Sequence, residues 1–272
     1  MNAESSAQQV YTELLQRIGE AHPRPRIEPV RRLAELAGSP QLSFPVIQVA
    51  GTNGKTSTSR AIESLLRAHG LRTGLFTSPH LVEFSERFQL DGQPIGGAQL
   101  AAAWEELRLP LQLVDRELLE TGQSPITFFE ALVVLALLCF ADAPVDVAVL
   151  EVGIGGEWDA TNIVDAQVAV FTPIDLDHTA ILGHSITEIA RTKAGIVKRG
   201  AVAVTARQHE DALGELRQAT AEKEVPLLVA GVDFDLLDDR LAVGGRLLEM
   251  RGITGHTYQP GFVPLYGSHQ AD

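Results

Sequence analysis

The sequence FPVIQVAGTNGKTS at residues 44–57 decides the fold of this chain. Its first half, FPVIQVA at 44–50, is short, apolar and rich in β-branched residues, which predicts a buried β-strand. A glycine-rich turn follows, and the apolar residues after it recur at helical spacing: Ala61, Ile62, Leu65 and Leu66. A strand, a glycine-rich turn and a helix in this order are typical of a loop that binds phosphate.

The turn GTNGKTS at 51–57 carries the candidate nucleotide-binding residues. Its backbone N–H groups can converge on a phosphate, and the dipole of the following helix favours an anion there. Lys55 can reach the outer phosphates, and the Thr56 hydroxyl can bind a magnesium ion. The full P-loop pattern has a further glycine where this chain has Val49, so only G-x-x-G-K-T matches. We predict that nucleotide is bound by Gly51, Thr52, Asn53, Gly54, Lys55 and Thr56.

Predicted helices and strands alternate on both sides of this turn. Apolar spacing and turn residues predict helices at 10–18, 29–36, 97–120, 126–140, 185–194 and 208–223. They predict strands at 72–76, 145–152, 168–172, 201–205 and 226–229, with hairpins at 87–95 and 234–251. The fold class is therefore α/β, a P-loop sheet of mainly parallel strands flanked by helices, with a small β-hairpin region. We find no internal repeat and predict one domain over residues 1–272.

The composition is that of a globular protein with an acidic balance. Of the 272 residues 45% are hydrophobic, and 22 basic against 35 acidic residues give a net charge of −13. This charge disfavours nonspecific binding to nucleic acid and to an anionic membrane surface. A local phosphate site remains compatible with it, because a site can be positive while the whole chain is negative.

The sequence predicts a cytoplasmic protein. The single cysteine, Cys139, can form no internal disulfide, and we expect it to be buried and unreactive in the apolar run 131–141. That run is too short to span a bilayer. The stretch MNAESSAQQVYTELLQ at 1–16 has neither the basic nor the apolar segment of a signal peptide.

Acidic and imidazole side chains follow two further predicted strands. Glu151 comes at the end of the strand 145–152, and DLDH at 175–178 follows the strand 168–172. The carboxyl ends of parallel strands meet at one edge of a sheet, where ligands bind in this architecture. A metal site at Glu151 and His178 is one interpretation, and a solvated strand end with a structural histidine is the other.

Seven motifs stand in one order along the chain: GTNGKTS (51–57), TSPHL (77–81), TFFE (127–130), LEVGIGG (150–156), DATN (159–162), LDH (176–178) and KAGI (193–196). With them, the chain from about residue 27 to its end resembles the folylpolyglutamate synthase and dihydrofolate synthase family, within the Mur ligase superfamily. This resemblance implies the fold of the Mur ligase central domain. It also implies an ATP-dependent amide ligase that uses Mg²⁺.

In the implied reaction, a carboxylate of folate or dihydropteroate attacks the γ-phosphate of ATP, and the amine of L-glutamate then displaces phosphate from the acyl phosphate. Positioning and charge neutralisation dominate catalysis of such transfers. The implied catalytic residues are Lys55, His178 and Lys193, and the implied magnesium ligands are Thr56, Ser78, Glu151 and His178. The position matching Lys193 carries a carbamate in the family, which requires an uncharged amine.

The resemblance also implies a pteroate or folate pocket. The positions that line it are Thr127, Phe128, Phe129, Glu130, Trp158, Asp159 and Ala160. Phe129 could stack on the pterin ring. For Phe128 and Trp158 we favour packing in the core over contact with substrate.

Two positions depart from the family pattern. Many members have a basic residue where this chain has Glu157, which puts a contact to a substrate carboxylate there in doubt. Many have Glu where this chain has Thr192, which removes a neighbour of Lys193.

The chain is also shorter than the family. Members carry a Rossmann-like C-terminal domain that binds glutamate and part of ATP, and here the chain ends LYGSHQAD (265–272), similar to an interdomain segment G-x-H-Q-x-x-N. We therefore expect this chain alone to be inactive as a ligase, and expect a monomer. The alternatives are a Mur-type amino-acid ligase and a noncatalytic nucleotide-binding module. About 45 residues precede Val46, too few for a separate substrate domain of the Mur type.

Overall fold

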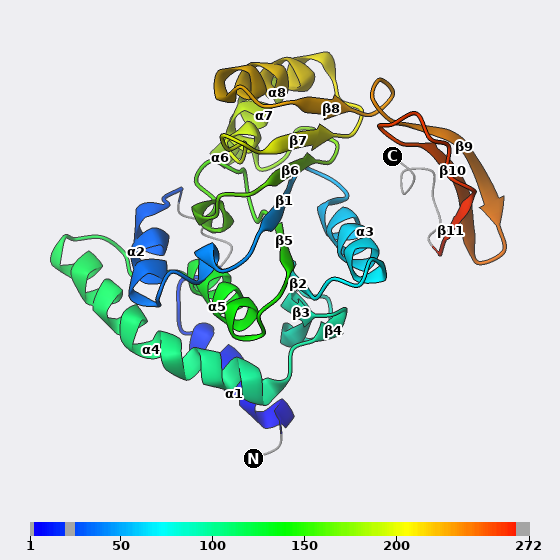
Figure 1. The fold of residues 1–272 in the computed structure, drawn as a ribbon. Coiled ribbons are helices and arrows are strands. Elements are labelled where there is room, and N and C mark those ends of the chain that lie inside the picture. The colour runs from blue at the N-terminus through cyan, green and yellow to red at the C-terminus, as the bar shows by residue number, and fades with distance from the viewer. Residues whose placement is uncertain (1–2, 20–24, 265–272) are drawn as a thin grey trace.

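The computed structural model describes residues 3–19 and 25–264. Its centre is an eight-stranded sheet in the order β4-β3-β2-β5-β1-β6-β7-β8 (Figure 1). The six strands from β2 to β8 in this order are parallel, and β3 and β4 are antiparallel at one edge. The strands are β1 (Val46–Ala50), β2 (Thr73–Phe76), β3 (Phe88–Leu90), β4 (Gln93–Pro94), β5 (Val147–Glu151), β6 (Val168–Phe171), β7 (Val202–Thr205) and β8 (Leu227–Val229).

Helices cover both faces of this sheet. On one face α3 packs alone, against Val49, Leu75 and Val149. The opposite face carries two larger clusters, one around α5 and one around α7 and α8. The helices are α1 (Ala3–Leu14), α2 (Glu28–Leu36), α3 (Lys55–Ala68), α4 (Gly97–Glu120), α5 (Phe128–Asp142), α6 (Thr179–Leu182), α7 (Ile186–Ala194) and α8 (Glu210–Lys223), with 3₁₀ turns η1 (Pro40–Leu42), η2 (Phe84–Arg87) and η3 (Ala160–Ile163).

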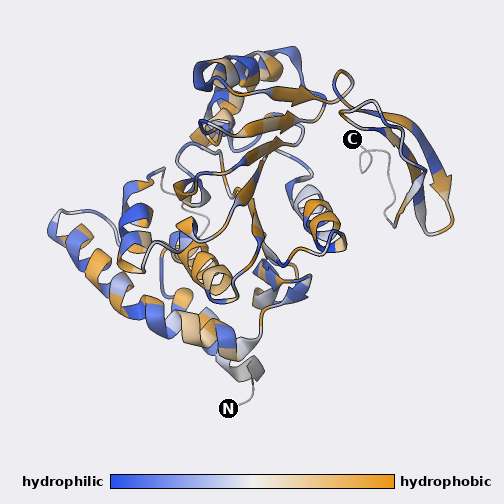
Figure 2. Ribbon diagram, in the orientation of Figure 1, coloured by the Kyte–Doolittle hydropathy of each residue, from blue (hydrophilic) through white to orange (hydrophobic). Residues whose placement is uncertain are grey.

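Helix α5 is the centre of the largest core. It is apolar on all sides and almost wholly buried, because it lies between the sheet and the helices α2 and α4. Figure 2 shows its hydrophobic colour beside the mixed colours of α4. Cys139 lies within α5 and is buried, as the sequence predicts, and burial raises the pKa of its thiol.

The α/β class, the parallel sheet and the glycine-rich turn between β1 and α3 are confirmed. Helix α4 begins and ends where the sequence predicts, and the other matching elements shift by a few residues at their ends. At the predicted hairpin 87–95, Asp91 and Gly92 have φ of 50° and 73°, which is the conformation of a tight primed turn.

The first helix lies earlier in the chain than its apolar spacing indicates. The spacing of Val10, Leu14, Leu15 and Ile18 predicts a helix through these residues, but α1 runs from Ala3 to Leu14 and ends before the last two. Val10 and Leu14 are buried as expected, but Leu15 is exposed.

The predicted apolar face of α3 is also wrong in part. Leu65 is 64% exposed and Ala61 is exposed, whereas Glu63 is buried on the sheet side. Glu63 is tolerated there because it accepts hydrogen bonds from the Thr73 hydroxyl at 2.6 Å and from Arg67 at 3.2 Å. The packed face therefore combines two partly buried apolar residues, Ile62 and Leu66, with the hydrogen-bonded Glu63.

The C-terminal hairpins form a second sheet of their own. Strands β9 (Asp235–Ala242), β10 (Gly245–Arg251) and β11 (Gly261–Val263) are antiparallel in the order β11-β10-β9. Figure 1 shows this sheet projecting from the end of the large one, beyond β8. The sequence predicts its first two strands and misses β11. The end motif at 265–272 lies outside the described residues. Among the helices that the structure describes, none is long and apolar enough to cross a bilayer.

We predict that Leu137→Ala lowers the free energy of unfolding by about 2–5 kcal/mol, because it opens a cavity in the fully buried middle of α5. Urea unfolding followed by circular dichroism measures this change. Leu65→Ala, at an exposed position of α3, is the matched control and should change it by less than about 0.5 kcal/mol. Equal effects of the two substitutions would contradict the assignment of the core.

Candidate functional site

The phosphate loop turns sharply over the edge of the sheet. Gly51 has φ of +149°, and a Cβ atom on it would lie 1.8 Å from the Thr172 hydroxyl oxygen at the end of β6. Gly54 precedes α3 with φ of +80°. Only glycine fits the first position, and glycine is favoured at the second. The Thr52 N–H donates to the Pro173 carbonyl at 3.0 Å, which ties the loop to the segment after β6.

Two ammonium groups converge on one carbonyl of this loop. Lys55 Nζ donates to the carbonyls of Gly51 and Thr52 at 3.2 and 3.1 Å, and Lys193 Nζ donates to that of Gly51 at 2.8 Å. Lys193 is almost fully buried. Its burial, and secondly the charge of Lys55, lower the pKa of Lys193 to about 8. The site thus makes the neutral amine accessible near neutral pH, which is the chemical requirement of the implied carbamate.

Thr56, Ser78 and Glu151 meet beside the loop. The Thr56 hydroxyl donates to both carboxylate oxygens of Glu151, at 2.8 and 3.0 Å, and the Ser78 N–H donates to one of them at 3.2 Å. Glu151 ends β5 and is 2% exposed. Burial raises the pKa of Glu151, and the hydrogen bonds from Thr56 and Ser78 oppose that shift.

This trio suits a magnesium ion. Its donors are hard oxygens, and Mg²⁺ prefers few protein ligands and completes its shell with water and phosphate oxygens. Within residues 3–19 and 25–264, no three His, Cys, Asp or Glu side chains cluster as a metal site. The hydroxyl-and-carboxylate set fits the ion by the chemistry of its donors alone.

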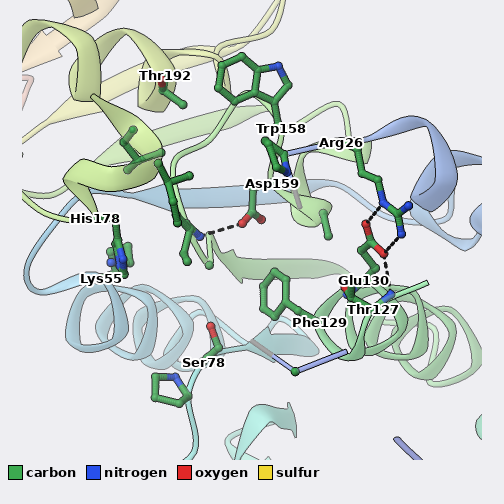
Figure 3. A pocket seen from close by; sticks show the side chains of 18 residues that line it. Arg26, Lys55, Ser78, Thr127, Phe129, Glu130, Trp158, Asp159, His178 and Thr192 are labelled. Atoms are coloured by element: carbon green, nitrogen blue, oxygen red, sulfur yellow. Dashed lines mark hydrogen bonds and ion pairs between the residues drawn. The ribbon is translucent and has the colours of Figure 1, made fainter. Parts of the chain in front are cut away.

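His178 lies at the same end of the site. It follows β6 with φ of 48°, and its Nε2 is 3.5 Å from the carboxylate of Asp177. It lines the same cavity as Lys55 and Ser78 (Figure 3). The structure thus places His178 near the phosphate loop, with the carboxylate of Asp177 beside its ring.

A cavity of about 500 Å³ opens beside these residues (Figure 3). It extends from the phosphate loop to the N-terminus of α5. Its lining residues are Gly19, Pro25, Arg26, Lys55, Ser78, Pro79, Thr127, Phe129, Glu130, Gly153, Ile154, Trp158, Asp159, Ala160, His178, Ile181, Leu182 and Thr192.

The aromatic residues predicted for the pocket divide between cavity and core. Phe129 and Trp158 line the cavity, and Trp158 is 41% exposed, so the core packing that we favoured for Trp158 is wrong. Phe128 is buried, with Tyr11 edge-on to its ring and the Arg87 guanidinium 5.5 Å from its centroid. Adjacent helical residues point in different directions, so Phe129 faces the cavity while Phe128 faces the core.

Two acidic residues of the cavity wall are held by other groups of the chain. Glu130 is paired with Arg26 at 2.8 and 2.9 Å and also accepts from the Thr127 N–H in a capping box at the start of α5. Asp159 accepts from the backbone and hydroxyl of Thr161 and from the Ile154 N–H. Burial raises the pKa of Asp159, and these hydrogen bonds oppose it.

Sequence reasoning missed several residues of this cavity. Arg26 is the main one, because it belongs to no motif and precedes α2 in a short polar segment. Its guanidinium also donates to the carbonyls of Ser124 and Pro125 at 2.8 Å, which ties Arg26 to the segment before α5. Pro79, Ile154, Ile181 and Leu182 lie in or beside the motifs that the resemblance uses.

The model of the Mur ligase middle domain matches residues 49–242, which is most of the described chain. The chain belongs to the Mur ligase family. Its resemblance to the folate branch of this family is confirmed by curated relatives. A dihydrofolate synthase/folylpolyglutamate synthase of Mycobacterium tuberculosis is 42% identical over 262 residues, covering 92% of this chain and 54% of the relative.

Solved structures of folylpolyglutamate synthases (FPGS) have the same fold as this chain. A Mycobacterium tuberculosis folylpolyglutamate synthase complexed with ADP superposes with a TM-score of 0.92 at 41% identity, over 99% of this chain and 60% of that one. An FPGS–AMPPCP–folate complex superposes with a TM-score of 0.89 at 34% identity, over 100% of this chain and 64% of that one. The chain thus spans about half the length of the first curated relative.

The two departures from the family pattern are neighbours. The Glu157 N–H donates to the Thr192 carbonyl at 2.8 Å, and a Cβ on Gly195 would lie 2.5 Å from Glu157 Cβ. The Glu157 side chain is exposed, whereas Thr192 lines the cavity beside Lys193. In this chain, Glu157 thus places a negative charge next to Trp158 at the cavity mouth.

We predict that the buried amine of Lys193 makes stability rise with pH. Its pKa is about 8 in the folded chain against 10.5 for an ordinary lysine, so between these values the unfolded chain binds more protons. The free energy of unfolding of the wild type relative to Lys193→Met should therefore increase from about pH 8 to about pH 10. Denaturant titrations across this range measure it. The exposed Lys223→Met is the control, and a flat difference for Lys193→Met would contradict the buried ammonium.

Proposed function

We propose that this chain is the ATP- and folate-binding part, residues 1–272, of an ATP-dependent ligase that adds glutamate to folate, and also to dihydropteroate. The observation that carries the proposal is that Lys55 and Ser78 belong both to the phosphate site and to the wall of the aromatic cavity. A flat aromatic acid in that cavity would bring its carboxylate to the outer phosphate of a nucleotide.

The phosphate site would bind and orient ATP. The N-terminus of α3 offers backbone N–H groups and a positive dipole end to the phosphates. Lys55 can leave its own loop carbonyls to pair with the outer phosphates. Both features neutralise charge where the γ-phosphoryl group is transferred to the substrate carboxylate.

Thr56, Ser78 and Glu151 would hold a magnesium ion, with His178 nearby at the cavity end. When bound, the ion neutralises charge on the phosphate oxygens during phosphoryl transfer. Glu151 suits this role because its buried carboxylate is oriented by Thr56 and by the Ser78 backbone. Lys193 would stay beside the Gly51 carbonyl or, as a carbamate, supply an anionic oxygen pair.

The cavity would bind the pteroyl part of the substrate. Phe129 and Trp158 offer aromatic faces, and Asp159 offers a carboxylate edge, which suits a flat heterocycle with N–H donors. The Arg26–Glu130 pair fixes the wall opposite the phosphate loop. Relatives described as folylpolyglutamate synthases, and the solved complex with AMPPCP and folate, support this assignment over a Mur-type amino-acid ligase.

Glutamate binding is proposed for the remainder of the full-length protein, since the match covers only 54% of the Mycobacterium tuberculosis relative. We further propose a cytoplasmic location, supported by the single cysteine, which is buried and free, and we propose a monomer.

We predict that the complete gene product, supplied with ATP and Mg²⁺, releases ADP only when both glutamate and a pteroyl substrate are present. Comparing tetrahydrofolate with dihydropteroate in a coupled ADP assay identifies which substrates are accepted. ATP binding without such release would instead favour a noncatalytic nucleotide-binding module.

Lys55→Ala should lower this ADP release by about 100-fold or more, because a charge that neutralises the transferred phosphoryl group is lost. Lys223→Ala, an exposed lysine of α8, is the matched control and should keep wild-type activity. Thermal melts of both variants show that the fold is intact. Retained activity of Lys55→Ala would contradict the assigned phosphate site.

A further inference from the structure

Gln48 places an amide in the middle of the central strand of the sheet. Strand β1 is otherwise apolar, and Gln48 is fully buried between its strand neighbours Leu150 and Ala169. Side chains alternate along a strand, so Gln48 lies on the face opposite Val49, which packs against α3. A buried amide is costly unless it has a hydrogen-bond partner, so its partner shows what it does.

The Gln48 amide begins a chain of hydrogen bonds that ends at the cavity. Gln48 Nε2 donates to Thr161 Oγ1 at 2.9 Å, and Thr161 Oγ1 donates to Asp159 Oδ1 at 2.5 Å. Gln48 and Thr161 are both fully buried, while Asp159 lines the cavity (Figure 3). A side chain in the sheet is thereby linked to the cavity wall through a single hydroxyl group.

The Asp159 carboxylate determines which groups donate and which accept in this series of hydrogen bonds. It accepts from the backbone N–H groups of Thr161 and Ile154, both at 2.9 Å, so it acts as an acceptor toward the Thr161 hydroxyl as well. Since a hydroxyl has one proton, the oxygen of Thr161 must then accept from Gln48. If the Gln48 amide were turned around, its oxygen and the Asp159 carboxylate would both need the single proton of the Thr161 hydroxyl.

The other end of the amide has no partner. Gln48 Oε1 is buried and makes no hydrogen bond within the described part of the chain. The amide therefore adds one hydrogen bond to the fold and leaves one acceptor unsatisfied, which is a poor arrangement for stability. An apolar side chain of similar length would fill the position at least as well. Stability thus gives no reason for an amide here, whereas the link to Asp159 does.

We propose that Gln48 is a positioning residue for the pteroyl substrate, holding the Thr161 hydroxyl so that Asp159 keeps a fixed orientation at the cavity. This inference rests on the proposed function. Gln48 stands three residues before Gly51, so one strand places both the phosphate loop and, through Thr161, the part of the cavity wall at Asp159. Strand β1 thereby helps to position both ATP and the pteroyl substrate.

The test is Gln48→Met in the complete gene product. Its KM for the pteroyl substrate should rise by about tenfold, because the hydrogen bond that holds the Thr161 hydroxyl, and through it the Asp159 carboxylate, is lost. The KM for ATP and kcat should stay within about twofold, and the melting temperature should be unchanged or higher, because the unsatisfied acceptor is removed as well. Thr161→Val should raise the same KM but lower the melting temperature, because the buried Gln48 amide then loses its acceptor. Thr161→Ser, which keeps the hydroxyl, should have the wild-type KM.

Gln41→Met is the matched control. Its Oε1 is likewise buried without a partner in the described part of the chain, but it belongs to η1, outside the cavity lining. It should leave both KM values unchanged. A lower melting temperature for Gln48→Met with unchanged kinetics would make Gln48 purely structural, and equal rises in both KM values would assign its effect to β1 as a whole. Either result overturns the inference. Wild-type protein without pteroyl-dependent ADP release would instead overturn the proposed function, and this role with it.

Discussion

The contact between Gly51 and Thr172 is the constraint on which the rest of the structure depends. Strands β1 and β6 leave the sheet so close together that a side chain at position 51 would overlap the Thr172 hydroxyl. The chain must therefore turn directly over the sheet edge, and α3 begins four residues later at Lys55. This turn also directs the Gly51 carbonyl toward the ammonium groups of Lys55 and Lys193, which draws α7 against the same loop.

The site is assembled from segments that are distant in the sequence but share this edge. Glu151 ends β5, Asp159 follows it in the next loop, and His178 follows β6. Glu151 is held by the strand itself, whereas Asp159 caps η3 and His178 precedes α6, in the loops that follow the strands. The cavity wall near α5 is held by an ion pair instead. Arg26 and Glu130 form it, and it joins two segments about a hundred residues apart in the sequence.

Much of this arrangement could be predicted from the sequence because it follows from local patterns. The strand–glycine–helix order predicts the phosphate loop, and positions after strand ends predict Glu151 and His178 as neighbours of it. Side-chain direction within a motif could not be predicted, since Phe128 and Phe129 are chemically alike and only packing separates core from cavity. Leu65 shows the same limit, because a buried Glu63 with two partners displaces the expected apolar face. Arg26 has no local signal at all, since its role comes from contacts with α5.

The position of Cys139 makes the largest core of this protein accessible to a simple chemical probe. The chain has one thiol, and it lies fully buried inside α5, where burial also keeps it protonated. A thiol reagent can reach it only when the packing around α5 opens. The rate of labelling at this single atom therefore reports how often the core opens in the native state, without any engineered label.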